Sequence, residues 1–268
     1  MQETKFPFEI IIHDDASTDE TVSILQQFSK LYPNIIKLIL QPKNTFSENV
    51  HLPFKVALKE ASGKYISLCE GDDYFIRKDK IAKNVAKIES DEKYTFIFTP
   101  AVIYDETTKK KSIRNKYTQN EINNIDFEWV VMNGGAFYPT PTVFFKKSIF
   151  DIYPDWYEKH ITGDYPLALL AVQKGVIGYI DLETACYRKN QGSVTNKKFV
   201  NIKSAVSEFE NKYYINVNFY QFLHSEFLIN DKLKIYMIKK EFYIYNSKVL
   251  NYCNDFKILK NLFGNKLT

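Results

Sequence analysis

Short, mostly apolar runs alternate with amphipathic stretches through the first quarter of the chain. The runs Phe8–Ile12, 35–40 and 64–69 predict three buried strands. Between them, apolar residues recur at helical spacing over 22–28 and 54–61, which predicts two helices. Alternating strands and helices are typical of an α/β fold, so we expect a mostly parallel sheet flanked by helices.

Local signals mark where these elements begin and end. Ser17 is followed three places later by Glu20, a pattern typical of a capping box at a helix start. Tyr32-Pro33 and Gly63 follow the two helical patterns and stop them. The polar residues that follow the first and third apolar runs are therefore expected to form loops at the carboxyl ends of strands.

The rest of the chain contains similar signals. Further helices are predicted over 79–88 and 165–173, and further strands over 94–104, 142–145 and 176–180. From residue 199 onward Gly and Pro are scarce, and apolar residues recur at helical spacing. We therefore expect an α/β domain over 1–198 and a helical C-terminal extension over 199–268. That extension either packs against the domain or a second subunit, or lies on a membrane surface.

The composition excludes several classes of protein. With 268 residues and 45% hydrophobic content, the chain can bury a sizeable core. Its 36 Lys and Arg against 32 Asp and Glu leave a net charge of +4, which is too small to indicate a nucleic-acid partner. The 3 cysteines favour neither a disulfide framework nor a zinc cluster, and no run of about 18 apolar residues predicts a membrane span. We expect a cytoplasmic protein, with peripheral contact at the inner face of the membrane left open.

Adjacent carboxylates occur at the ends of the first and third predicted strands. Asp72 and Asp73 would repel each other unless a cation or hydrogen-bond donors compensate them, and Mg²⁺ or Mn²⁺ suits such oxygen ligands. Each pair also has a simpler explanation, because Asp72-Asp73 can form a solvated turn and Asp14-Asp15 can stabilise a nearby helix start. Since the carboxyl ends of parallel strands meet at one edge of a sheet, we expect both pairs to lie in one site.

Two segments together resemble the inverting family 2 glycosyltransferases, which have the GT-A (Rossmann-like) fold. They are 8–19, FEIIIHDDASTD, and 63–74, GKYISLCEGDDY, and the resemblance extends over about residues 6–195. It implies transfer of a sugar, of the hexosyltransferase type, from a nucleotide-diphosphate sugar to the hydroxyl of a glycan or lipid-linked acceptor. Synthesis of a surface polysaccharide or a glycoconjugate is the expected setting.

The resemblance also implies roles for individual residues. Asp15 corresponds to the family's contact with the nucleotide base. Asp72 and Asp73 correspond to its metal and diphosphate motif, with Asp73 as the more direct ligand of Mn²⁺ or Mg²⁺. The segment Thr162–Leu167 resembles the helix start that carries the family's catalytic base, which implies that Asp164 takes the proton from the acceptor hydroxyl. An Asp at this position could also cap the helix, and the two roles can coexist.

Two loops complete the resemblance. The stretch 133–142, NGGAFYPTPT, is similar to the family's acceptor-side loop, and its glycines allow the backbone to approach a ligand closely. The stretch 187–194, YRKNQGSV, is similar to a late loop that folds over the donor, where Arg188 could bind phosphate. A solvated basic loop explains the second stretch equally well.

One part of the family pattern is missing. Family members begin with a further strand and helix, and residues 1–7 resemble the linker that follows that helix. We therefore expect the domain to lack its first strand–helix unit, with apolar surface uncovered and activity weakened. Two alternatives stay open: a truncated, non-catalytic remnant that binds nucleotide or a partner protein, and a nucleotidyltransferase. The lack of a Gly-rich phosphate loop disfavours the latter.

Overall fold

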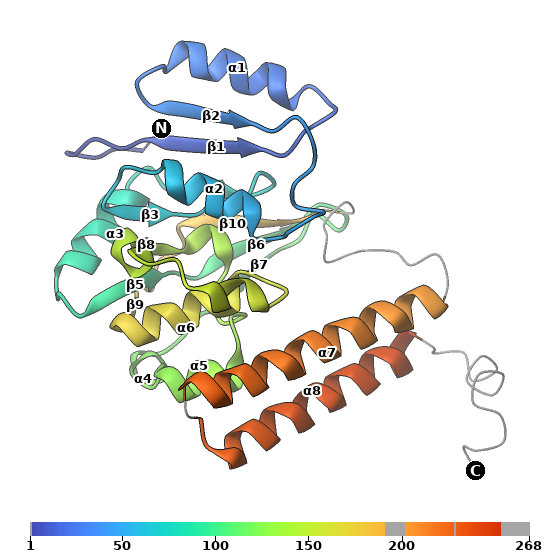
Figure 1. Cartoon of the computed structure of the whole chain (residues 1–268). Helices are drawn as coiled ribbons and strands as arrows, with labels where there is room; N and C mark the ends of the chain where they lie inside the picture. Colours follow the sequence, from blue (N-terminus) through green and yellow to red (C-terminus); the bar gives the residue numbers. More distant parts are fainter. Residues whose placement is uncertain (1, 191–201, 228, 253–268) are drawn as a thin grey trace. The chain divides into compact units, whose positions relative to one another are not determined.

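The protein divides into two compact units, each described below by itself. The structure is a computed structural model that describes residues 2–190, 202–227 and 229–252 (Figure 1). The first unit comprises residues 1–158 with 162–191, and the second comprises 159–161 with 192–268. The domain boundary predicted at 198–199 lies outside the described residues.

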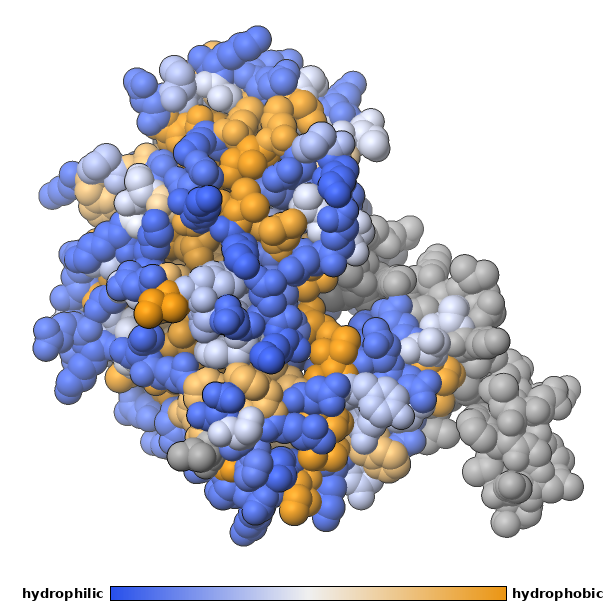
Figure 2. Space-filling view, in the orientation of Figure 1, coloured by the Kyte–Doolittle hydropathy of each residue, from blue (hydrophilic) through white to orange (hydrophobic). Residues whose placement is uncertain are grey.

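The first unit begins with a two-stranded layer. β1 (Ile10–Asp14) and β2 (Ile36–Leu40) form a parallel pair, connected by α1 (Thr21–Leu31). The pairing continues as far as Asp14 opposite Leu40, so the first strand extends two residues beyond the predicted apolar run. Exposed apolar side chains gather over this layer in Figure 2, and α1 contains no fully buried residue. The layer therefore adds little buried apolar surface to the core.

The predicted capping box at the start of α1 is wrong. The helix has Glu20 at its N-cap position, and no side chain bonds to the cap. The hydroxyl of Ser17 instead donates to Oδ2 of Asp14, at 2.5 Å, and the Ser17 N–H donates to Oδ1 of the same carboxylate. The buried Asp14 carboxylate needs hydrogen-bond donors, so the Ser17 hydroxyl bonds to it and not to the backbone at the start of α1.

The core lies in a four-stranded sheet of order β3–β8–β5–β9. Its strands are β3 (Tyr65–Ser67), β8 (Phe144–Lys146), β5 (Tyr94–Phe98) and β9 (Val176–Tyr179). The associated helices are α2 (Leu52–Glu60), α3 (Lys80–Glu89) and α6 (Asp164–Lys174). Ile88 of α3 packs with Ile97 and Phe144 in a fully buried cluster, because α3 places one apolar face on the sheet.

A second four-stranded sheet has the order β4–β10–β6–β7. Its strands are β4 (Tyr74–Phe75), β10 (Ala185–Lys189), β6 (Ala101–Asp105) and β7 (Lys111–Arg114). The single strand predicted over 94–104 is wrong, because β5 ends at Phe98 and β6 begins at Ala101. Pro100 lies in the break, and proline cannot donate a ladder hydrogen bond.

The sheets are mixed, so the predicted mostly parallel sheet is wrong. Among the described strands, β1–β2, β10–β6 and β5–β9 pair in parallel, whereas β10–β4, β3–β8, β5–β8 and β6–β7 pair antiparallel. β8 inserts antiparallel between β3 and β5, and β7 turns back on β6 after a short connection. As a result β1 and β3 belong to different sheets, although both end near acidic residues.

Short elements connect these sheets, and two helices form the second unit. The short elements are α4 (Gln119–Asn123), α5 (Phe127–Asn133), η1 (Thr140–Thr142), η2 (Lys147–Phe150) and η3 (Asp155–Lys159). The predicted helical tail is confirmed by α7 (Ile202–Phe227) and α8 (Asp231–Tyr252), which pack side by side in Figure 1. Among the described residues, no helix is both long enough and apolar enough to cross a membrane.

Candidate active site

The acidic loop Glu70–Asp73 connects β3 with β4. β3 ends at Ser67, and the next residue, Leu68, donates its N–H to the carbonyl of Val143 at 3.3 Å. The loop then closes on itself, because the N–H of Asp73 donates to the carbonyl of Glu70 at 3.0 Å. This turn gathers three carboxyl groups at the exit of the central sheet.

Arg188 of β10 binds this loop. Its backbone N–H donates to Oδ1 of Asp73 at 2.8 Å, and its Nε donates to the carbonyl of Asp72. Its Nη1 donates to Glu106 at 3.0 Å. Asn190 adds a longer contact, 3.4 Å, to Oδ2 of Asp72. Because β10 pairs with β4 directly after the acidic loop, the sheet itself places the arginine beside the two aspartates.

Asp73 has the features of a metal ligand. Its Oδ2 is buried and has no hydrogen-bond partner among the described residues. Burial and the neighbouring charge of Asp72 raise the pKa of Asp73 to about 6, against the opposing hydrogen bond from Arg188. A divalent cation would supply the missing partner, because carboxylate oxygens are the ligands that Mg²⁺ and Mn²⁺ prefer.

The aspartates would need further ligands to hold a cation. Within the part of the chain that the structure describes, no group of three or more His, Cys, Asp or Glu side chains could hold a metal ion. Mg²⁺ is commonly bound by one or two carboxylates together with the phosphates of a substrate, and the adjacent carboxylates of Asp72 and Asp73 are compatible with such a site.

Glu70 and Asp164 lie on either side of Thr140. The Thr140 hydroxyl donates to Oδ1 of Asp164, at a long 3.5 Å, and it also bonds to the Glu70 side chain. Glu70 is accessible to solvent yet closely surrounded by protein atoms. This desolvation, with the charges of Asp164, Asp73 and Asp72, raises the pKa of Glu70 to about 8. Desolvation also raises the pKa of Asp164 to about 6.

The charge of Asp164 contributes to the raised pKa of Glu70, which couples Asp164 electrostatically to the 70–73 loop. Near neutral pH, Glu70 retains its proton while Asp164 is mostly ionised. Two carboxyl groups of similar chemistry are thus set to different protonation states by their surroundings, a pattern that is enriched at functional sites.

Asp164 is the first residue of α6 and does not cap it. The N-cap position belongs to Gly163, and no side chain bonds there. The capping alternative for Asp164 is therefore wrong, and its carboxylate is left to face Thr140. As an acidic side chain in the first turn, it still interacts favourably with the helix dipole.

Three contacts fix the start of α6. The Tyr138 hydroxyl donates to the carbonyl of Asp164 at 2.5 Å, and the Tyr157 hydroxyl donates to the carbonyl of Gly163 at 3.1 Å. Gly135 lies against the same backbone, where an added Cβ would stand 2.5 Å from the Asp164 carbonyl carbon. The loop glycine predicted to approach a ligand therefore approaches the helix that carries Asp164.

Replacing Gly135 with Ala is expected to lower the free energy of unfolding by about 1–3 kcal/mol, because the new methyl group has no room beside the α6 backbone. Thermal denaturation would measure this loss. Gly71→Ala is the matched control, since a Cβ at Gly71 meets no atom within 4 Å. Equal stability of the two variants would contradict the close approach at Gly135.

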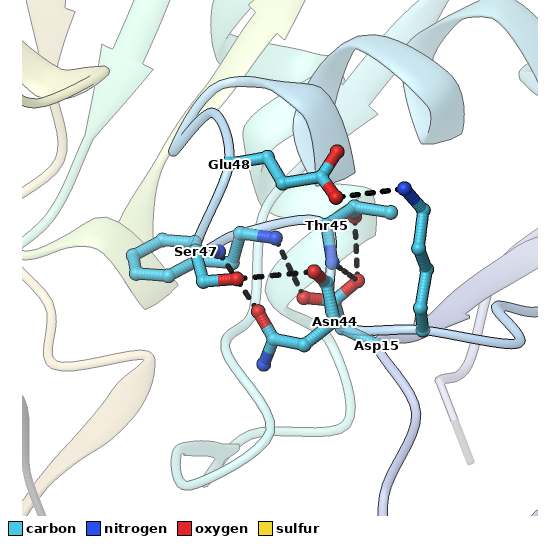
Figure 3. A network of polar contacts seen from close by, with 7 residues as sticks. Asp15, Asn44, Thr45, Ser47 and Glu48 are labelled. Carbon is cyan, nitrogen blue, oxygen red and sulfur yellow. Dashed lines mark hydrogen bonds and ion pairs between the residues drawn. The ribbon is translucent and has the colours of Figure 1, made fainter.

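Asp15 makes its contacts elsewhere. Its Oδ1 accepts from the Thr45 N–H at 2.8 Å and the Thr45 hydroxyl at 2.5 Å, and its Oδ2 accepts from the Phe46 N–H at 2.8 Å (Figure 3). Desolvation alone would raise the pKa of Asp15, but these hydrogen bonds outweigh it and lower the pKa. Figure 3 shows the carboxylate at the base of the 44–48 loop, whose conformation it stabilises.

Of the five residues that the sequence singled out, the structure places Asp72, Asp73 and Arg188 together, and it places Asp164 close enough to affect Glu70 by its charge. Arg188 donates to both Asp72 and Asp73, and the charge of Asp164 acts on Glu70 in the same loop. The described contacts of Asp15 are with the 44–48 loop and not with this cluster. The prediction that Asp14-Asp15 and Asp72-Asp73 share one site assumed that the strands before them are parallel neighbours. These strands, β1 and β3, lie in different sheets.

Sequence reasoning gave no role to two residues that lie beside the candidate site, Glu70 and Thr140. Glu70 belongs to the segment 63–74 that resembles the family, but the resemblance gave it no role. Its proximity to Asp164 follows only from the folded structure. Thr140 lies between Pro139 and Pro141, and nothing in the sequence indicates that its hydroxyl bonds to carboxyl groups of two other segments.

A buried lysine lies behind the acidic loop. Lys80, the first residue of α3, is completely inaccessible to solvent. Its Nζ donates to the Ser67 hydroxyl at 2.9 Å and stands 4.2 Å from the centroid of the Phe75 ring. It therefore connects the strands on both sides of the acidic loop. Burial lowers its pKa to about 7.

We expect Lys80→Met to flatten the pH dependence of stability in the alkaline range. A lysine whose pKa is lower in the folded than in the unfolded protein binds fewer protons when folded, so stability rises with pH between about 7 and the ordinary 10.5. The expected slope is at most about 1.4 kcal/mol per pH unit. Urea denaturation across this range would measure it. Lys83→Met, at a half-exposed position of α3, should keep the slope; if Lys80→Met also keeps it, the assignment is wrong.

The sequence is similar to those of known glycosyltransferases. The model of the family described as "Glycosyl transferase family 2" matches residues 1–151, more than half of the chain. An uncharacterised protein of Mycobacterium tuberculosis is 41% identical over 109 residues, which covers 40% of this chain and 31% of that protein. TarS of Staphylococcus aureus, a poly(ribitol-phosphate) β-N-acetylglucosaminyltransferase, is 34% identical over 85 residues, 32% of this chain and 14% of TarS. These matches span less than a third of the relatives' own length.

Solved structures agree on the fold. TarS residues 1–349 with UDP-GlcNAc gives a TM-score of 0.57 at 17% identity, covering 92% of this chain and 66% of that chain. The mannosyltransferase PcManGT from Pyrobaculum calidifontis, solved with GDP-Man and Mn²⁺, gives 0.53 at 10% identity, covering 95% and 69%. The predicted α/β fold of the GT-A type is confirmed, with mixed sheets. Because the family model covers more than half of the sequence, the chain belongs to glycosyl transferase family 2.

Proposed function

We propose that this protein transfers a sugar from a nucleotide-diphosphate sugar to an acceptor hydroxyl, in a metal-dependent reaction that inverts the anomeric centre. The observation that carries the proposal is the gathering of Asp73, Glu70 and Asp164 around one site, with a buried oxygen of Asp73 left without a partner. Membership of the family and the likeness to TarS with UDP-GlcNAc support it.

Asp73 and Asp72 are the residues that would hold Mn²⁺ or Mg²⁺, together with the donor diphosphate. When bound, such an ion supplies positive charge that stabilises the leaving diphosphate. The Mn²⁺ in the structure of PcManGT supports this choice. Arg188 bonds to Asp72 and Asp73 and so supports the loop, and we propose that its guanidinium, paired with Glu106, also contributes to binding the donor phosphate. Asp15, through the 44–48 loop, is proposed to shape the nucleotide side of the site.

Asp164 is the proposed general base. It would accept the proton of the acceptor hydroxyl as that oxygen attacks the anomeric carbon, while the bond from this carbon to the diphosphate oxygen breaks on the opposite face. With its pKa raised to about 6, the carboxylate is ionised near neutral pH and is a stronger base than an ordinary Asp. Glu70, which retains its proton, can donate a hydrogen bond to a ligand in the same site.

The proposed acceptor is a glycan or a lipid-linked saccharide, and the proposed setting is the synthesis of a surface polysaccharide or glycoconjugate. The support is the similarity to TarS, a poly(ribitol-phosphate) β-N-acetylglucosaminyltransferase. A panel of nucleotide sugars, each with and without Mn²⁺, tests the donor part of the proposal. Release of nucleoside diphosphate from one donor, dependent on the metal, is expected. No binding of any donor would count against the proposal.

A further inference from the structure

The two helices of the second unit pack through one face of α8. Leu233, Met237 and Glu241 of α8 are buried, at one-turn intervals. The Glu241 carboxylate accepts from Asn216 at 2.9 Å and from Tyr220 at 3.4 Å, both on α7. This face accounts for the pairing of α7 with α8.

A second set of side chains lies on the opposite face of α8 and remains exposed. Large apolar and aromatic residues alternate there with lysines, again at helical spacing. The set, which we call the outer face, is Lys232, Ile235, Tyr236, Lys239, Phe242 and Tyr243. Ile235 is 49% exposed and Tyr243 is 73% exposed. Phe242 contacts the Tyr213 ring of α7, with centroids 6.3 Å apart, but it stays half exposed. Packing within the helix pair therefore explains only a small part of this apolar face.

α8 has a positive net charge, and Lys232 and Lys239 lie on its exposed side. The helix contains five Lys and two acidic residues. One of the two, Glu241, is buried toward α7, and the other, Asp231, is 2.9 Å from Lys234. Lys232 and Lys239 of the outer face thus stand beside apolar side chains with little compensating negative charge.

We propose that the outer face of α8 binds the surface of a membrane that contains anionic phospholipids. Aromatic and aliphatic side chains flanked by lysines are the pattern of helices that lie in a membrane interface, where the rings enter the headgroup region and the ammonium groups meet phosphates. A protein partner fits less well, because lysine is depleted in the cores of protein interfaces. Binding at this face is independent of sugar transfer.

Co-sedimentation of the full chain with vesicles tests the proposal. Binding is expected to vesicles of phosphatidylcholine mixed with phosphatidylglycerol, to be weaker with phosphatidylcholine alone, and to fall as salt is added. The double variant Lys232→Gln/Lys239→Gln should bind about 30-fold more weakly, since each lysine near an anionic surface contributes about a five-fold factor. Tyr243→Ser should also weaken binding, because it removes an exposed ring without disturbing the helix pair.

A matched variant separates the outer face from net charge. Lys30→Gln/Lys110→Gln changes the total charge equally through exposed lysines of the first unit and should bind vesicles like the unchanged protein. Circular dichroism of each variant checks that the helices are kept. The proposal is overturned if the unchanged protein ignores anionic vesicles, if the control variant loses as much binding, or if Tyr243→Ser instead dissolves a dimer of the chain.

Discussion

Asp164→Asn is expected to lower the rate of sugar transfer by about 10²–10⁴-fold while leaving donor affinity nearly unchanged. Asparagine keeps the shape of the side chain and its acceptor oxygen toward Thr140, but it cannot take a proton from the acceptor. Initial rates of transfer and calorimetric titration with the donor would measure the two quantities separately. If the protein is instead a non-catalytic remnant, the alternative left open by the sequence, the unchanged protein would bind the donor but transfer no sugar.

The pH dependence of the unchanged enzyme gives a second readout of Asp164. Its pKa of about 6 implies that the rate falls as pH drops through that value, because the protonated acid cannot act as a base. Asp151→Asn, at an exposed position of the same unit, serves as the control and should keep both the rate and the profile. Full activity of Asp164→Asn would refute the assignment of the base.

Asp73→Asn is expected to lower transfer by about 10³-fold or more and to abolish the effect of Mn²⁺ on donor binding. A bound metal ion contributes several kcal/mol to such reactions, and the variant replaces its main ligand oxygen with an amide nitrogen that cannot coordinate it. The amide oxygen can still accept from the Arg188 N–H, so the loop should keep its shape.

Thermal shift with Mn²⁺ and a nucleoside diphosphate would check this expectation. The unchanged protein should be stabilised by the pair of ligands together, and Asp73→Asn should not. Asp72→Asn should show a smaller loss, since Oδ2 of Asp72 already has a contact from Asn190 whereas Oδ2 of Asp73 has none among the described residues. An equal response of all three proteins to Mn²⁺ would contradict the proposed roles.

The sequence predicted the positions of most strands and helices because their apolar periodicity is strong and local. It could not predict strand direction, because β8 pairs antiparallel through contacts with β3 and β5 that are far away in the sequence. The same limit explains the capping error at Ser17. Nothing in the pattern of the residues shows that a buried aspartate three positions earlier competes for the hydroxyl.

The sequence could predict only those residues of the candidate site that belong to a recognisable motif. Asp72, Asp73 and Asp164 were proposed because carboxylates in those contexts resemble a family motif, and their roles stay predictions. The contribution of Thr140, and the raised pKa of Glu70, depend on side chains meeting across the fold. Asp15 matched the motif equally well, yet its described hydrogen bonds show a residue that shapes a loop.

Anomalous diffraction from Mn²⁺, in crystals grown with UDP or GDP, tests the account most directly. We expect one strong manganese peak bonded to Oδ2 of Asp73 and to the diphosphate, with the carboxylate of Asp164 across the space that the sugar would occupy. A manganese ion bound away from Asp73, or a diphosphate on a face remote from Asp164, would contradict the account.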